Sequence, residues 1–187
     1  KIASVTVTAD AAGIASNLSA LAAAGSKLTA IARTDAADVA LALTGADFDS
    51  HRAELAKISD GYLVDLTAVT AGRAASVATN SHVKSIKVAD TAVHLSAAWD
   101  GMSAIGSKLT EVAQSDSAQI SLTASQWART QSLGAKFSTT LKLGIASAGV
   151  ADLATLDADS TVQAIQVSAT AATISAGWSS LAADAKL

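Results

Sequence analysis

The sequence has no cysteine and no proline, and only 3% of its 187 residues are aromatic. Without cysteine the chain can form no disulfide, no thiolate metal site and no cysteine nucleophile. The absence of proline favours short, regular connections between secondary-structure elements. Half of the residues are hydrophobic and alanine is abundant. We therefore expect one substantial core in which small side chains let the layers pack closely.

The sequence also lacks any run of charges of one sign. Its 13 Lys and Arg residues and 16 Asp and Glu residues give a net charge of −3, which provides no electrostatic footprint for nucleic acid or for an anionic membrane. No apolar stretch approaches the roughly 18 residues of a membrane-spanning helix, and no charged-then-apolar leader opens the sequence. We expect no nucleic-acid partner and no membrane insertion.

The most informative feature present is an internal repeat. The segment Gly-Ser-Lys-Leu-Thr at 25–29 recurs at 106–110, and Leu-Thr at 43–44 recurs at 122–123. A triplet with apolar residues at its first and third positions opens each repeat, at 5–7, 86–88 and 165–167. We predict a single domain over residues 1–187, with one repeat at about 5–85, a second at about 86–164 and a partial third at about 165–187.

Hydrophobic periodicity in each repeat switches between that of strands and that of helices. The expected strands are Val5–Val7, Leu41–Leu43, Val64–Leu66, Ile86–Val88, Ile120–Leu122, Leu141–Leu143 and Ile165–Val167, with two more around Ile31 and Val112. Amphipathic helices separate most of them. One short step in each repeat, at 34–38 and 115–117, has no room for a helix. It is either a hairpin or a helix-free coil, and we favour the coil.

This rhythm predicts an α/β fold, specifically a right-handed β/α solenoid. Its strands are expected to form one mainly parallel sheet with helices on one face, in a super-repeat of about 80 residues and four coils. The capping-box spacings Thr44 to Asp47 and Thr123 to Gln126 predict helix starts. Gly25 and the equivalent glycine at 106 are expected to end helices in the left-handed conformation.

Polar residues between the apolar strand positions predict that the other sheet face is open. This face is the candidate partner surface, and the alternative is that its residues are simply solvated strand positions. The residues concerned are Thr6, Asp65, Lys87, Ser121, Lys142 and Gln166. The set mixes charges of both signs and contains no aromatic residue.

Residues with reactive side chains do not recur between the repeats. His51, His82 and His94 correspond to threonines in the next repeat, so we assign them to the surface. Asp35 and Asp116 do recur, but their loops lack the six to eight oxygen ligands that calcium prefers, and we expect them to cap their own turns. Three tryptophans, at 99, 127 and 178, are expected in the core. We predict no catalytic, cofactor-binding or metal-binding residue and no enzyme activity.

The segment Val88-Ala89-Asp90-Thr91-Ala92, followed by an apolar helix, by residues 106–112 and by Ile-Ser-Leu-Thr at 120–123, resembles the tandem repeats of large bacterial exported proteins. These proteins are often type I-secreted and associated with calcium-binding RTX modules. The resemblance implies an extracellular or cell-surface location and a scaffold, adhesin or filament role. The calcium-binding nonapeptide of RTX modules is missing here, so calcium binding is not carried over.

These observations predict a structural or interaction repeat module of a secreted or cell-surface bacterial protein, of the scaffold or self-assembling filament or surface-layer type. End-to-end self-association is expected, because a cut array exposes apolar coil surfaces at both ends. A surface glycan or a protein could also be a partner. The alternative function is an adhesin module that binds carbohydrate or calcium through the open sheet face or the repeated Asp loops.

Overall fold

The computed structural model describes residues 2–187, apart from the side chains of residues 130 and 131. The strands are β1 (Val5–Ala9), β2 (Leu28–Arg33), β3 (Ala40–Thr44), β4 (Leu63–Val69), β5 (Val83–Asp90), β6 (Leu109–Gln114), β7 (Ile120–Thr123), β8 (Leu143–Ala148) and β9 (Val162–Val167). The helices are α1 (Ala11–Ser16), α2 (Leu18–Ala23), α3 (Gly45–Ser50), α4 (Arg52–Leu55), α5 (Ala71–Ala78), α6 (Ala92–Ala97), α7 (Trp99–Ser103), α8 (Ala124–Trp127), α9 (Thr130–Gly134), α10 (Leu153–Ala158), α11 (Ala171–Ala176) and α12 (Trp178–Ala183). Short 3-10 helices span Gly25–Lys27, Gly106–Lys108 and Val150–Asp152.

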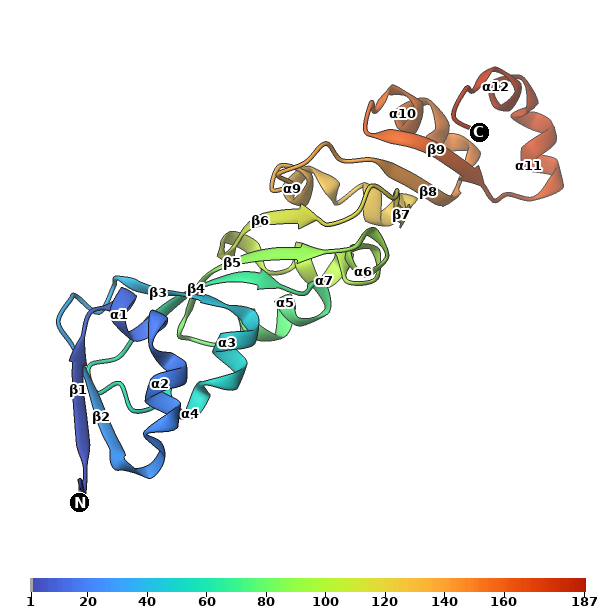
Figure 1. Ribbon diagram of the computed structural model, residues 1–187. Helices are drawn as coiled ribbons and strands as arrows, with labels where there is room; N and C mark the ends of the chain where they lie inside the picture. The colour runs from blue at the N-terminus through green and yellow to red at the C-terminus, as the bar shows by residue number, and fades with distance from the viewer. Residues whose placement is uncertain (1) are drawn as a thin grey trace.

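The molecule is elongated, with its two termini at opposite ends (Figure 1). Its paired strands are all parallel and form an α/β fold of three sheets, with the orders β1-β2, β3-β4-β5-β6 and β7-β8-β9. Two isolated parallel bridges extend the sheets, between Ile31 and Ile58 and between Val112 and Phe137. Strands and helices therefore alternate along the axis of the molecule, as the periodicity predicted.

The prediction of one sheet is wrong, because the two short loops, between β2 and β3 and between β6 and β7, each connect strands that belong to different sheets. β2 pairs with β1 and β3 pairs with β4, so the loop at 34–39 forms neither a hairpin nor a coil of the same sheet. The Arg33 side chain, only 1% exposed, holds this corner. Its guanidinium donates hydrogen bonds to the Asp35 carboxylate at 2.8 Å and to the carbonyls of Ala36 at 2.9 Å and Val39 at 2.7 Å.

The second repeat builds the same corner with a shorter side chain. Gln114 donates through Nε2 to the Asp116 carboxylate at 2.8 Å and to the Ala118 carbonyl at 2.7 Å. Residues 5–82 contain four strands joined by helical connections and one corner, and residues 83–161 contain the same order of strands, helices and corner.

Alternation along the strands separates a buried face from a polar face. Leu41 and Leu43 are buried while Ala42 between them is exposed, and the same pattern holds for β5 and β7. The buried side chains of strands and helices form a core cluster that runs from Ala11 to Ile165. The predicted strand Leu141–Leu143 is displaced, because β8 begins only at Leu143.

The predicted chain-turning residues adopt the expected local structure. The Thr44 hydroxyl accepts a hydrogen bond from the Asp47 amide at 3.0 Å, and Thr123 forms a reciprocal capping box with Gln126. Gly25 has a φ of +58° and Gly106 a φ of +72°, the left-handed region in which a Cβ is unfavourable. The helix starts and ends predicted at these positions are confirmed.

Candidate binding surfaces

The predicted partner surface is spread along the molecule rather than gathered into one site. Thr6 lies in the first sheet, Asp65 and Lys87 lie in the second, and Ser121, Lys142 and Gln166 lie in or beside the third. All of these side chains except that of Asp65 belong to exposed residues. The structure therefore keeps these residues accessible but does not bring them together.

Two of these residues are engaged by neighbouring strands. The Asp65 carboxylate accepts a hydrogen bond of 2.6 Å from the Ser85 hydroxyl, and Lys87 forms an ion pair of 2.8 Å with Glu111. Hydrogen bonding between Lys87 and Glu111 raises the pKa of the lysine and lowers the pKa of the glutamate, because each side chain favours the charged form of the other. These contacts are the cross-strand pairs that stabilise a sheet.

The histidines contact local groups. His82 stacks on Tyr62 with ring centroids 4.1 Å apart, His51 Nδ1 lies 3.0 Å from the Asp47 carbonyl oxygen, and His94 Nδ1 lies 2.7 Å from Asp90 Oδ1. Among the described residues, no group of three or more His, Cys, Asp or Glu side chains is placed to hold a metal ion.

The repeated aspartates accept hydrogen bonds from a helix of the preceding strand–helix segment. Three carboxylates accept a hydrogen bond from the first amide of such a helix: Asp35 from Ala11 at 2.9 Å, Asp90 from Ala71 at 2.9 Å and Asp116 from Ala92 at 3.1 Å. Negative charge is favourable there because the first amides of a helix lack internal partners and carry partial positive charge. Asp35 and Asp116 also contact residues of their own turns, through Arg33 and Gln114, so the contact with the preceding helix is an addition to the expected turn capping.

Four lysines make the complementary contact at the other end of the helical connections. Their ammonium groups donate to main-chain carbonyls of an earlier segment: Lys57 to Gly25 at 3.2 Å, Lys108 to Ala78 at 2.8 Å, Lys136 to Gly106 at 3.2 Å and Lys186 to Asp159 at 2.9 Å. Carbonyls at a helix C-terminus lack internal donors, and positive charge there is favourable. Successive segments are thus tied at both ends of their helices.

The tryptophans have three different environments. Trp99 is fully buried and stacks on Phe137 with ring centroids 5.9 Å apart. Trp127 is half-buried and donates through Nε1 to Asp159 at 2.9 Å. Trp178, which occupies the position of Trp99 in the third repeat, is 65% exposed. The prediction of a core position is therefore wrong for Trp178, because residues 2–187 include no later segment that covers it as Phe137 covers Trp99.

The C-terminal end of the molecule consequently presents an apolar hollow. Its volume is 310 Å³, and it is lined by Val167, Ile174, Trp178, Leu181, Ala182 and Leu187. Trp178 begins α12, which lies at the tip of the molecule (Figure 1). The side chains that line this hollow are all hydrophobic and none is charged.

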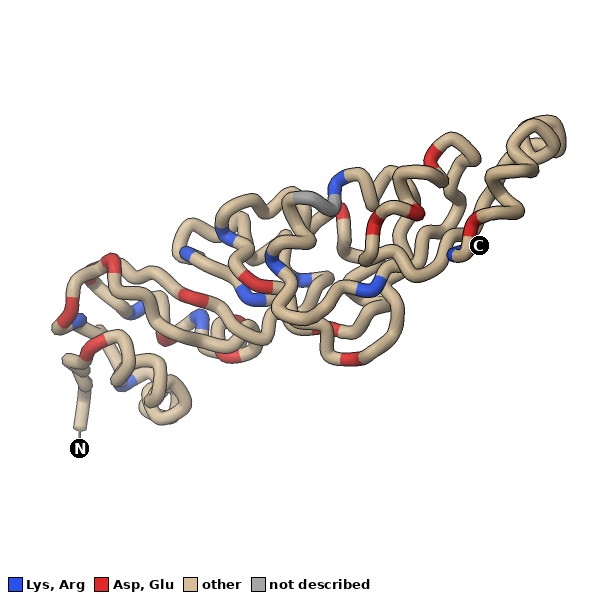
Figure 2. Tube along the Cα trace, turned by 90° about the horizontal axis from the view of Figure 1, so that it is seen from above, with Lys and Arg blue, Asp and Glu red and all other residues tan. Residues whose placement is uncertain are grey.

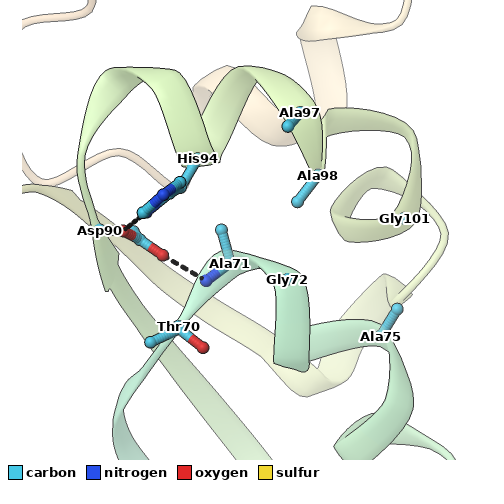
Figure 3. Close-up of a pocket in the computed structure, with 9 residues that line it drawn as sticks. All are labelled: Thr70, Ala71, Gly72, Ala75, Asp90, His94, Ala97, Ala98 and Gly101. Carbon is cyan, nitrogen blue, oxygen red and sulfur yellow. Dashed lines mark hydrogen bonds and ion pairs between the residues drawn. The ribbon is translucent and has the colours of Figure 1, made fainter.

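A second, larger pocket lies between α5 and the α6–α7 pair (Figure 3). Its volume is 560 Å³, within the range of small-molecule sites. Most of its lining is small, with Ala71, Gly72 and Ala75 facing Ala98 and Gly101 across the gap. The sequence prediction missed this pocket, and the signal that could have found it was the coincidence of small residues on two helices that pack together.

The polar edge of this pocket is formed by Asp90 and His94, with Thr70 nearby (Figure 3). The carboxylate accepts hydrogen bonds from the amides of Ala71 and Thr91, both at 2.9 Å. Burial opposes ionisation, but the hydrogen bonds from Ala71, His94 and Thr91 outweigh it and lower the pKa of Asp90. The pocket therefore has apolar walls and one anionic group at neutral pH.

Figure 2 shows charges of both signs along most of the tube, but none on the terminal helices α11 and α12. No helix within residues 2–187 is long and apolar enough to cross a membrane. Comparisons with protein-family models, with curated proteins and with solved structures returned no match to this chain. Function is therefore inferred from the surfaces described above.

Proposed function

We propose that this chain is a structural repeat module, rather than an enzyme, and that it forms scaffolds or filaments by associating through its ends. In this proposal the strands and helices follow a right-handed β/α solenoid path, with a super-repeat of about 80 residues. The parallel pairing of successive strands supports that path. We place the module in a secreted or cell-surface bacterial protein on the resemblance of its sequence.

The observation that carries the proposal is the contrast between Trp99 and Trp178. These equivalent side chains are 0% and 65% exposed, and only the internal one is covered by a later segment. An end with an uncovered aromatic and an apolar hollow favours association, because repeat arrays need polar caps to stay soluble and separate.

A lysine near the N-terminal end is also exposed. Lys27 occupies the position of Lys108, whose ammonium group bonds carbonyls of the preceding segment. Within residues 2–187 Lys27 has no hydrogen-bond partner of this kind, and its residue is exposed.

Light scattering coupled to size-exclusion chromatography over a wide protein concentration range tests this proposal. We expect the average mass to rise with concentration, and the substitution Trp178→Ser to abolish the rise. Val93→Ser is the matched control, because Val93 is 72% exposed on the side of the molecule and not at its end. A monodisperse monomer at high concentration, or equal effects of both substitutions, would contradict end-to-end association.

A further inference from the structure

Strand β1 leaves one edge of the first sheet open. Among residues 2–187 it pairs only with β2. Its sequence Val-Thr-Val-Thr-Ala contains no charged residue and no proline, which are the residues that usually protect an exposed edge from pairing. The Ala9 carbonyl accepts a hydrogen bond from the Thr34 amide, on the side of β2. Because alternate residues of a parallel strand direct their main-chain groups to opposite sides, Thr6 and Thr8 direct theirs to the open edge.

The opposite end of the molecule carries an open edge on β9 (Figure 1). The Ser168 amide donates to the Ala148 carbonyl, on the side of β8. The Ile165 amide donates outwards, to the Lys186 carbonyl. The next residue that faces outwards is Val167, and no strand of the described chain lies beside it. An incoming strand can therefore pair with this edge from Val167 onward.

The helix pairs at the two ends also match each other, because both are uncharged. Neither α1–α2 nor α11–α12 contains a charged residue. Between internal neighbours the helical layer instead carries ion pairs, such as the one of 2.6 Å between Arg73 and Asp49. An uncharged helix pair can pack over the exposed Trp178 ring without burying an unpaired charge.

The direction of the strands selects which ends can meet. The paired strands are all parallel, and β1 and β9 occupy equivalent positions of the repeat. If two like ends join edge to edge, either their strands run antiparallel or the polar face of one sheet continues the buried face of the other. Only β9 of one molecule beside β1 of another keeps the strands parallel and the buried faces continuous.

We propose that the molecules associate head-to-tail, with β1 of one copy added in parallel to the open edge of β9 of a second copy and with α1–α2 covering Trp178. The Thr8 amide then donates to a carbonyl at the β9 edge, and β1 takes the place that β6 has beside β5. This inference rests on the proposed function, because it specifies which ends join. A head-to-tail contact that does not close into a ring extends into an open filament.

The substitution Thr8→Pro tests the strand contact. It removes the amide that faces the open edge and leaves the hydrogen bonds to β2 in place, and proline is tolerated on edge strands in this orientation. Thr8→Ala is the matched control, because it keeps the amide and changes only an exposed side chain. In light scattering coupled to size-exclusion chromatography, we expect the Thr8→Pro variant to stay monomeric and the Thr8→Ala variant to associate like the unmodified chain. The circular dichroism spectra of all three should agree.

Ala20→Arg is an independent variant of the same end. Ala20 is exposed and occupies the position of Gly101, where an added Cβ would lie 3.5 Å from Ala75 Cβ of the preceding helix. A charged side chain at this position would be buried against α11–α12 of the second copy, so this variant should also stay monomeric. If Thr8→Pro alters the fold, Ala20→Arg decides the same question.

A mixture of two variants decides the direction of the contact. Thr8→Pro keeps an intact C-terminal end and Trp178→Ser keeps an intact N-terminal end, so each alone is expected to be monomeric. Mixed in equal amounts, they should form a species of twice the 18.5 kDa mass of one chain and stop there.

A mixture that stays monomeric would overturn the head-to-tail arrangement. If Thr8→Pro and Ala20→Arg still dimerise while Trp178→Ser does not, like ends join, so the association through ends stands but the head-to-tail arrangement is wrong. An unmodified chain that stays monomeric at every concentration contradicts both the association and its direction.

Discussion

Substitution of the buried tryptophan should destabilise the protein much more than substitution of its exposed equivalent. Truncating a buried tryptophan to alanine costs about 3–5 kcal/mol, and Trp99 is fully buried against Phe137. Its Nε1 atom, however, has no hydrogen-bond partner among the described residues, so the substitution also removes a polar group that is buried at a cost. We therefore expect a loss near the lower end, about 3 kcal/mol.

Trp178→Ala should cost less than about 1 kcal/mol, because the side chain is already 65% exposed and loses little contact. For a chain of this length, about 3 kcal/mol corresponds to a fall in Tm of about 6–12 °C for Trp99→Ala, against a small change for Trp178→Ala.

Thermal unfolding followed by circular dichroism at low protein concentration measures both changes. Low concentration matters because association through the C-terminal end would bury Trp178 and add to its apparent contribution. Equal Tm shifts for the two substitutions in monomeric samples would refute the assignment of Trp99 to the core and Trp178 to an uncovered end.

The contacts between segments should also be measurable by substitution. Lys108→Met should cost about 1–2 kcal/mol in urea unfolding, because two main-chain carbonyls lose a charged donor, whereas Lys27→Met should change stability by less than about 0.5 kcal/mol. Gly106→Ala should cost about 1–2 kcal/mol in the same assay, because its φ of +72° disfavours a Cβ. The Ala11 amide bonded to Asp35 and the Gln114 side chain bonded to Asp116 hold the pKa of each carboxyl below its ordinary value of 3.8. The stability that each ionised carboxylate contributes is therefore complete above that value and is lost as the pH falls below it. In an acid titration, the Asp35→Asn and Asp116→Asn variants should lose less stability than the unmodified chain between about pH 4, the ordinary carboxyl pKa, and about pH 2.

Local signals in the sequence were sufficient where the structure depends on neighbouring residues. The hydroxyl of Thr44 and the left-handed glycine at 106 act within one turn of chain, so spacing alone identified them. Periodicity also located the strands but not always their ends. Leu141, Leu143 and Ile145 alternate without interruption, and only pairing with β7, which sets Ile120 opposite Leu143, fixes where β8 begins.

Signals that depend on distant residues were missed. Asp35 bonds Ala11, 24 residues earlier, and no local spacing indicates that contact. Prediction of the pocket would have required knowing that residues 71 and 98 face each other. The exposure of Trp178 depends on which segments pack over it. The change of sheet after β2 involves the buried side chain of Arg33, to which no sequence pattern assigned a role.

The length of the helices explains why contacts between segments matter so much in this molecule. The longest described helix, α5, has 8 residues, and isolated helices shorter than about 12 residues are marginal in water. Their free amides and carbonyls must therefore be satisfied from outside, by Asp90 at the start of α5 and by Lys108 at its end. Because both of these partners come from the next segment, that segment stabilises α5. The terminal α11–α12 pair, with Trp178 uncovered, is the one helical connection of the described chain without a later segment packed on it, and it is there that association with another molecule would contribute most.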